Sequence, residues 1–218
     1  MIKFFQKLKA KKGFTLVELI VVIAIIGVLA AILIPTMLGY VTSSRVTSAN
    51  STAAEIKNNI DTFLTDADTA GYGMKQGAGL VSSTDITVTS GGTWAMTAFT
   101  SASNNFKTGG STITWGVGAS AVTLSTTKTG VTSAEQLLAI TLCNLFPEIK
   151  TAAIHVELVG GKCTAVAYTA DQGSAIATSD MPGITSGKFD STFAWDSKTA
   201  GVAPGGIIVG TAPAIPMN

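Results

Sequence analysis

The sequence predicts an α+β fold, in which a long N-terminal α-helix packs on an antiparallel β-sheet head with a short second helix. Three features predict it. Residues 14–70 carry apolar side chains first as a continuous run and then at helical spacing. The residues after Gly73 form short alternating runs broken by Gly, Ser and Thr, which is typical of strands. Ser133 stands three residues before Gln136, the spacing of a capping box that opens a helix.

The charges are divided unevenly along the chain. Only 12% of the 218 residues are charged, about half the share of an average soluble domain. Five lysines and no acidic residue precede Gly13, so the remainder has nine basic and 13 acidic residues and a net charge of −4. The basic charge belongs to the leader, and the acidic remainder gives no general reason to bind nucleic acid.

Residues 14–41 are apolar and long enough to cross a hydrocarbon core about 30 Å thick. The leader lysines should stay in the cytoplasm, which places the rest of the chain outside. A secretory signal peptide cut after Ala30 and a plain membrane anchor both explain an apolar run. Neither explains Glu18 inside it, because a carboxylate at the bilayer centre costs on the order of 3 kcal/mol.

The residues around Gly13 resemble the class III signal of type IV pilins and type II secretion pseudopilins. The similar stretch covers about 40 residues, with lysines, Gly13-Phe14, and Glu18 as the fifth residue of the apolar helix. The resemblance implies that a prepilin peptidase cuts after Gly13, that the new amine of Phe14 is methylated, and that the apolar helix is kept.

That cut would leave the Phe14 amine four residues from Glu18. Both charges are costly in a low dielectric unless they are paired. We therefore expect Glu18 to pair with the Phe14 amine of its own or a neighbouring subunit and to set the axial register. The resemblance implies a helical homopolymer, which the pilus assembly machinery draws from subunits in the cytoplasmic membrane, N-terminus inside, onto the cell surface.

An amphipathic helix follows the apolar run and ends near Gly71 and Gly73. Its apolar stripe is predicted to comprise Val46, Ala49, Ala53, Ile56, Ile60, Phe63 and Ala67. The predicted organisation is a leader over 1–13, a membrane and filament-core half over 14–41, an amphipathic half over 42–70, and a β-rich head over 71–218.

Two residues disturb the first half of this helix. Pro35 removes one backbone hydrogen bond and clashes with the carbonyl of Ala31, which predicts a kink. Gly27, eight residues earlier, has a poor helix propensity. The resemblance implies instead that residues 27–35 unwind once subunits assemble, and both outcomes stay open.

The head is predicted to contain several strands and one helix. The helix runs from Ala134 to about Leu145 and ends before Pro147. Gly160-Gly161 is a two-residue hairpin turn between two flanking strands. The predicted strands are residues 86–89, 93–100, 111–117, 121–125, 152–159 and 162–169, with weak strands over 188–194 and 206–209.

Cys143 and Cys163 are the only cysteines. A disulfide between them would pin the helix to the hairpin and contribute about 3 kcal/mol on the loop-entropy scale. Two free, buried thiols are the alternative. In many Gram-negative pilins the two cysteines bracket a loop near the chain end. Here 55 residues follow Cys163, so that loop is not carried over.

We expect no enzyme, because the chain has no Cys/His metal spacing, phosphate-binding glycine loop or nucleophile motif. His155, the only histidine, is expected to be a solvent-facing strand residue. The tail carboxylates are expected to be solvated, with a calcium site of the pseudopilin kind as the alternative; they are Asp171, Asp180, Asp190 and Asp196. The tryptophans are expected in the core or the sheet; they are Trp94, Trp115 and Trp195.

The leading interpretation is a major pilin, a structural subunit without a cofactor. A major pseudopilin of a type II secretion system is the alternative within the family, and a minor pilin acting as an adhesin or DNA-binding tip module is the alternative of a different class. The sequence leaves open whether the filament serves twitching motility, cell adhesion, DNA uptake or secretion.

Overall fold

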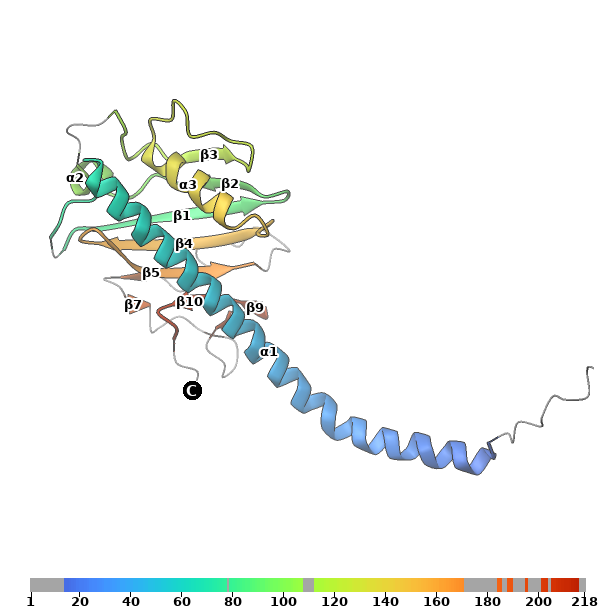
Figure 1. The fold of residues 1–218 in the computed structure, drawn as a ribbon. Helices are drawn as coiled ribbons and strands as arrows, with labels where there is room; N and C mark the ends of the chain where they lie inside the picture. Colours follow the sequence, from blue (N-terminus) through green and yellow to red (C-terminus); the bar gives the residue numbers. More distant parts are fainter. Residues whose placement is uncertain are drawn as a thin grey trace, which may run out of the picture. The chain divides into compact units, whose positions relative to one another are not determined.

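The computed structural model describes residues 14–77, 79–107, 112–170, 184–185, 188–189, 195, 201–203 and 205–215. The chain divides into two compact units, with the boundary between Ser44 and Arg45. The first helix, α1 (Leu16–Thr69), begins in the first unit and ends in the second (Figure 1).

The part of α1 in the second unit buries one apolar stripe, as its spacing predicts. The buried residues are Val46, Ala53, Ile56, Ile60, Phe63, Leu64 and Ala67. Ala49, also predicted for this stripe, is only partly buried. Six of the seven residues predicted for the stripe are therefore confirmed as buried, with Leu64 as an additional buried residue.

A six-stranded antiparallel sheet forms the centre of the second unit. Its strand order is β10-β5-β4-β1-β2-β3. The strands are β1 (Val81–Thr89), β2 (Thr93–Met96), β3 (Ala119–Val122), β4 (Ala152–Val159), β5 (Lys162–Thr169) and β10 (Gly210–Ala212). The turn between β4 and β5 has Gly160 and Gly161 at φ angles of 56° and 89°, the left-handed region that glycine tolerates. This hairpin is confirmed at both of its predicted boundaries.

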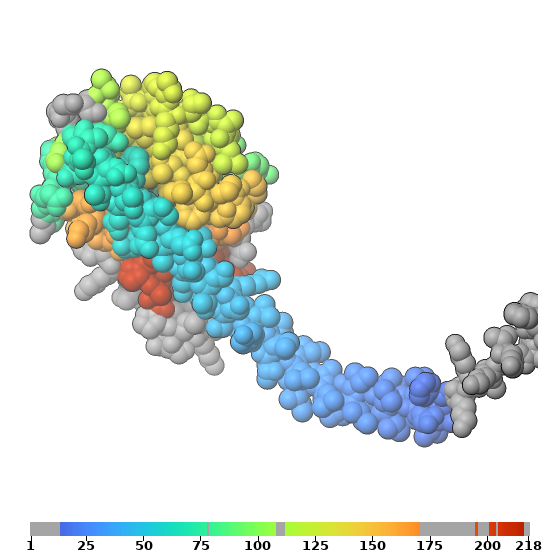
Figure 2. Space-filling view, in the orientation of Figure 1, coloured from blue at the N-terminus to red at the C-terminus, as the bar shows by residue number. Residues whose placement is uncertain are grey.

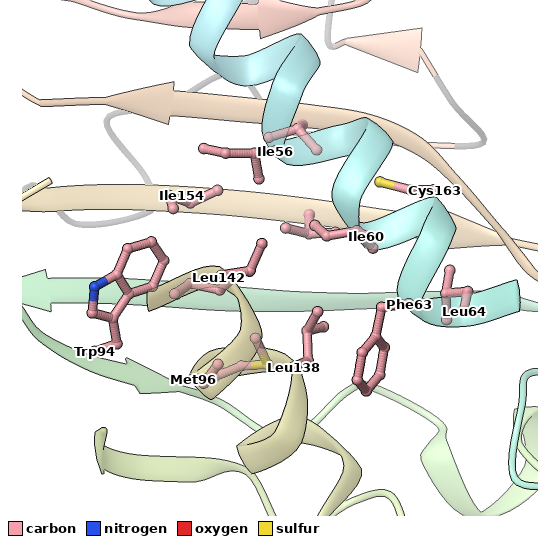
Figure 3. Close-up of a cluster of buried hydrophobic side chains, with 14 of the residues drawn as sticks. Ile56, Ile60, Phe63, Leu64, Trp94, Met96, Leu138, Leu142, Ile154 and Cys163 are labelled. Carbon is pink, nitrogen blue, oxygen red and sulfur yellow. The ribbon is translucent and has the colours of Figure 1, made fainter. Parts of the chain in front are cut away.

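The helices α1 and α3 (Ala134–Leu145) lie over the same face of this sheet (Figure 1). Ser133 caps α3, because its hydroxyl accepts a hydrogen bond from the Gln136 amide at 3.2 Å. Between the helices and the strands lies the main apolar core, which Figure 3 shows in close-up. Its side chains include Ile56 and Ile60 from α1, Leu138 and Leu142 from α3, and Trp94, Met96 and Ile154 from the strands.

The short elements complete the described part of the second unit. They are α2 (Ala102–Asn105), the hairpin of β6 (Ile184–Thr185) and β7 (Lys188–Phe189), and the hairpin of β8 (Val202–Ala203) and β9 (Ile207–Ile208). A second, smaller apolar cluster joins Ala153 and Ala167 of the sheet to Ala203 and Val209.

The strand predicted over 111–117 is wrong over residues 112–117; Ser111 lies outside the described residues. Only one isolated bridge forms there, between Thr114 and Ser133. Gly116 and Gly118 have φ angles of 94° and 76°, which break an extended chain. Trp115 instead stacks on Phe106, with ring centroids 4.2 Å apart.

The other strand differences are smaller. The strand predicted over 121–125 begins two residues earlier, at β3, and the one predicted over 93–100 ends at Met96. Of the weak strand predicted over 188–194, the structure shows Lys188–Phe189, and residues 190–194 lie outside the described residues. Of the weak strand predicted over 206–209, it shows Ile207–Ile208. The short strand β10 was not predicted.

The C-terminal strand lies directly against α1. A Cβ added at Gly210 would lie 2.7 Å from the Asn50 nitrogen and would overlap the carbonyl group of Ala49. The Asn50 side chain accepts a hydrogen bond from the Thr211 amide at 2.7 Å. In Figure 2 the red C-terminal segment lies beside the α1 residues of this unit. The glycine therefore allows strand and helix backbones to approach one another closely.

Candidate functional site

The start of α1 is a reciprocal capping arrangement between Thr15 and Glu18. The Glu18 carboxylate accepts hydrogen bonds from the Thr15 amide and the Thr15 hydroxyl, both at 2.8 Å. The Thr15 hydroxyl in turn accepts one from the Glu18 amide at 3.2 Å. Two amides that a helix start leaves unpaired are thus satisfied. Glu18 stands four residues after Phe14, whose side chain is exposed.

Thr15 is a residue that the sequence interpretation missed. The signal was present, because Thr15 and Glu18 have the Thr-x-x-Glu spacing of a capping box. The arrangement gives Glu18 a partner inside the single chain. Both of its hydrogen bonds come from neutral groups, so no cation within the described residues pairs with its charge.

The large apolar side chains of the first unit are exposed. Between Phe14 and Val41 their accessible fractions range from 89% to 46%. Among the described residues, α1 is the one helix long and apolar enough to cross a membrane. An apolar surface of this extent requires a lipid or protein environment to cover it.

The helix continues through Gly27 and Pro35 in this structure. The single chain thus accommodates proline within α1, and Thr36 donates a side-chain hydrogen bond to the Leu33 carbonyl at 2.9 Å. The unwinding of residues 27–35 refers to assembled subunits and stays a prediction. Gly13 and the rest of the leader lie outside the described residues.

The cysteines correct an expectation, because Cys143 and Cys163 are both free and buried. Cys163 pairs across the hairpin with Leu158, which pairs with Ser82 at the beginning of β1. Cys143 instead lines a cavity with Trp94, which pairs with Val88 near the end of β1. Six residues of strand separate these two positions, about 20 Å, whereas a disulfide needs Cα atoms within about 7 Å.

Burial raises the pKa of both thiols. For Cys163 the carboxylate of Asp61 adds to this effect, since Asp61 accepts a hydrogen bond from the Cys163 amide at 2.6 Å. Neither thiol has the lowered pKa of a reactive cysteine. Both act as core residues.

His155 is partly buried rather than fully solvent-facing, and it has a partner. Its Nδ1 lies 2.5 Å from the Asp85 carboxylate, directly across the β1–β4 ladder. Among the described residues no group of three or more His, Cys, Asp or Glu side chains is placed to hold a metal ion. The four tail aspartates considered for calcium lie outside the described residues.

The tryptophans were expected in the core or the sheet, and each of the three packs in or against an apolar cluster. Trp94 is fully buried in the main core, and Trp115 donates a hydrogen bond from its indole nitrogen to the Tyr72 carbonyl at 2.5 Å. Trp195 is partly buried and packs against the smaller apolar cluster.

Comparison with known proteins gives one family and several relatives. The prokaryotic N-terminal methylation motif matches residues 8–34. The type IV major fimbrial protein FimA of Dichelobacter nodosus is 44% identical over 61 residues, which are 28% of this chain and 39% of the relative. The type IV major alpha-pilin of Moraxella bovis is 44% identical over 62 residues, with the same two shares. A fimbrial protein of Moraxella nonliquefaciens is 42% identical over 74 residues, 31% of this chain and 48% of the relative.

The chain therefore spans less than half the length of these curated relatives. No solved structure gives a significant match. The matched motif contains Gly13, Phe14, Glu18 and Gly27, the residues on which the resemblance was based.

Proposed function

We propose that this chain, whose N-terminal segment is that of a type IV pilin, is the major structural subunit of a type IV pilus. The observation that carries the proposal is the start of α1, where no cation of the described residues pairs with Glu18 and the apolar surface that follows is uncovered. The relatives described above are fimbrial proteins and a major pilin, which favours a pilus subunit over a secretion pseudopilin.

Processing would complete this site in one step. Cleavage after Gly13 removes the five lysines of the leader and creates an amine at Phe14. A neighbouring subunit's amine can then approach Glu18, and pairing of the two charges offsets their desolvation inside the apolar bundle. Each subunit needs one such pair, so the pair fixes how far neighbouring helices are displaced along the filament.

The second half of α1 would attach the head to this filament core. Its apolar stripe is buried against α3 and the sheet, while its opposite face keeps exposed polar residues such as Glu55 and Asn58. In this proposal the chain contributes packing and charge pairing. Peptide cleavage and methylation are the work of separate enzymes.

The mass of the mature N-terminus tests the processing. Protein from sheared surface fibres should begin at N-methyl-Phe14. A chain that begins at Ala31 would have lost its apolar helix as a secretory signal, and the proposal would be wrong.

Substitution of Glu18 tests assembly. Glu18→Gln keeps an oxygen that accepts the Thr15 hydrogen bonds but removes the charge, so we expect the chain to be inserted and processed but filament yield to fall at least tenfold. Glu55→Gln removes an exposed carboxylate from the same helix and serves as the matched control. Filaments at the wild-type level from processed Glu18→Gln protein would exclude the charge pair as the assembly contact.

A further inference from the structure

A groove on the second unit contains the only arginine of the chain, Arg45. The groove has a volume of about 380 Å³ and lies between α1, the end of β5 and the β9 strand. Ser48 and Thr52 line it from α1, and Tyr168 and Ile208 from the strands. Among the described residues of its lining, the guanidinium is the one charged group.

The α1 side of the groove is one helix face, because positions 45, 48 and 52 are three and four residues apart. Arg45 is exposed and has no hydrogen bond or ion pair within the described part of the chain. Its guanidinium has five donors in a planar fork. The Thr52 hydroxyl already donates to the Ser48 carbonyl at 3.2 Å, so Ser48 is the hydroxyl that can add a donor.

Arg45 is also the first charged residue after Glu18. It follows Val41, the last residue of the apolar run, by four residues of the same helix. At 1.5 Å per residue these four residues correspond to about 6 Å. The polar region of each leaflet has a thickness of about the same size. The 28 residues 14–41 are about 42 Å long, so the helix must tilt or bend to keep them within a core about 30 Å thick. Arg45 then lies among the headgroups of the outer leaflet.

We propose that this groove binds the phosphate of a phospholipid headgroup in the outer leaflet while the subunit waits in the membrane before assembly. Arginine suits this ligand, because its planar fork binds two phosphate oxygens at once. Tyr168 and Ile208 offer an apolar wall for the glycerol backbone. The inference rests on the proposed function in that α1 must cross the membrane.

One arginine near a lipid surface gives only modest binding, about fivefold in affinity. This strength fits a subunit that must later leave the membrane. The contact orients the head relative to the bilayer without preventing extraction of the helix into the filament.

Native mass spectrometry of the mature chain in a phosphate-free maltoside detergent tests the proposal. Phosphatidylglycerol is titrated, and a galactolipid with the same acyl chains but no phosphate serves as the second ligand. We expect phosphatidylglycerol binding to weaken about fivefold in Arg45→Gln and less in Arg45→Lys, with galactolipid binding unchanged. Lys128→Gln, which removes the same charge from an exposed site elsewhere on the head, should bind both lipids like the wild type.

Three results would overturn the proposal. The first is equal loss of phosphatidylglycerol binding in Arg45→Gln and Lys128→Gln, which would indicate nonspecific attraction. The second is full competition by millimolar inorganic phosphate, which would indicate a free-anion site. The third is unchanged lipid binding with reduced filament yield in Arg45→Gln, which would assign Arg45 to a protein partner. All three results are compatible with a chain that is processed to N-methyl-Phe14 and inserted normally. They would therefore contradict the lipid site without contradicting the proposed function.

Discussion

Gly210→Ala should destabilise the head more than any other glycine-to-alanine substitution at a described position. A Cβ at this position would lie 2.7 Å from the Asn50 nitrogen and would overlap the Ala49 carbonyl, whereas real Cβ atoms stay at least 3.0 Å from such neighbours. Both obstacles are helix backbone, so no side-chain rotation relieves the clash. Strand β10 must move away from α1.

The expected cost has two parts. Overpacking of a close contact costs about 1–3 kcal/mol. Moving β10 also stretches the 2.7 Å hydrogen bond from the Thr211 amide to Asn50, which contributes about 1 kcal/mol. We therefore expect Gly210→Ala to lower the free energy of unfolding by about 2–4 kcal/mol.

Urea unfolding of the full chain in detergent, followed by tryptophan fluorescence, measures this change. Hydrogen exchange should also accelerate at residues 207–212. Asn50→Ala isolates the hydrogen-bond part and should cost about 1 kcal/mol. Gly39→Ala makes the same chemical change on α1 where no described atom lies within 4 Å, and it should leave unfolding of the head unchanged. Equal stability of Gly210→Ala and wild type would show that β10 does not rest on the helix backbone.

Three further changes follow from the buried groups. Burial raises the pKa of Cys163, so its protonated form stabilises the fold below the unfolded thiol pKa of about 8.5, and this contribution is lost as pH rises above that value. The difference in free energy of unfolding between wild type and Cys163→Ala, measured with urea, should therefore narrow between pH 8 and 10. A difference that stays constant over this range would argue against the prediction. Trp115→Phe removes the indole donor to the Tyr72 carbonyl and should cost about 1 kcal/mol in the same assay, while full stability would mean that water replaces the bond. Glu135→Ala leaves the Gly116 amide without its buried carboxylate acceptor and should lower the free energy of unfolding by about 2–3 kcal/mol. Glu135→Gln keeps an acceptor oxygen without the charge, and it should recover part of this stability if the acceptor matters more than the charge.

Local periodicity was enough to predict the main elements. Residues close together in the sequence decide three features: the three-and-four spacing of α1, the cap at Ser133 and the Gly160-Gly161 turn. For this reason α3, β4 and β5 were predicted at their observed boundaries.

The failures share a different cause, namely contacts between distant parts of the chain. Strand β10 exists because it pairs with β5 and touches α1 some 161 residues earlier in the sequence, and its three residues have no distinctive pattern. The alternation over residues 111–117 resembles a strand, but Trp115 is drawn into a cluster with Phe63, Phe99 and Phe106. Spacing also could not show that Cys143 and Cys163 lie toward opposite ends of the sheet along the direction of β1.

The site was predictable to the extent that it is a motif. Gly13, Phe14 and Glu18 could be chosen because the cleavage and charge pairing that we propose depend on their order along the chain. The groove at Arg45 needed the fold, since Tyr168 and Ile208 reach it from strands more than 100 residues away.

The continuity of α1 has a consequence for a filament under tension. If neighbouring subunits pack against one another through residues 14–41, a pulling force passes along the backbone of each helix and from one helix to the next through side-chain contacts. The sheet lies outside that path. It is attached to α1 by core packing and by hydrogen bonds such as the one that the Cys163 amide donates to the Asp61 carboxylate. In such a filament the strands would not carry the pulling force, so the head would not need a disulfide to stay folded when the fibre is stretched.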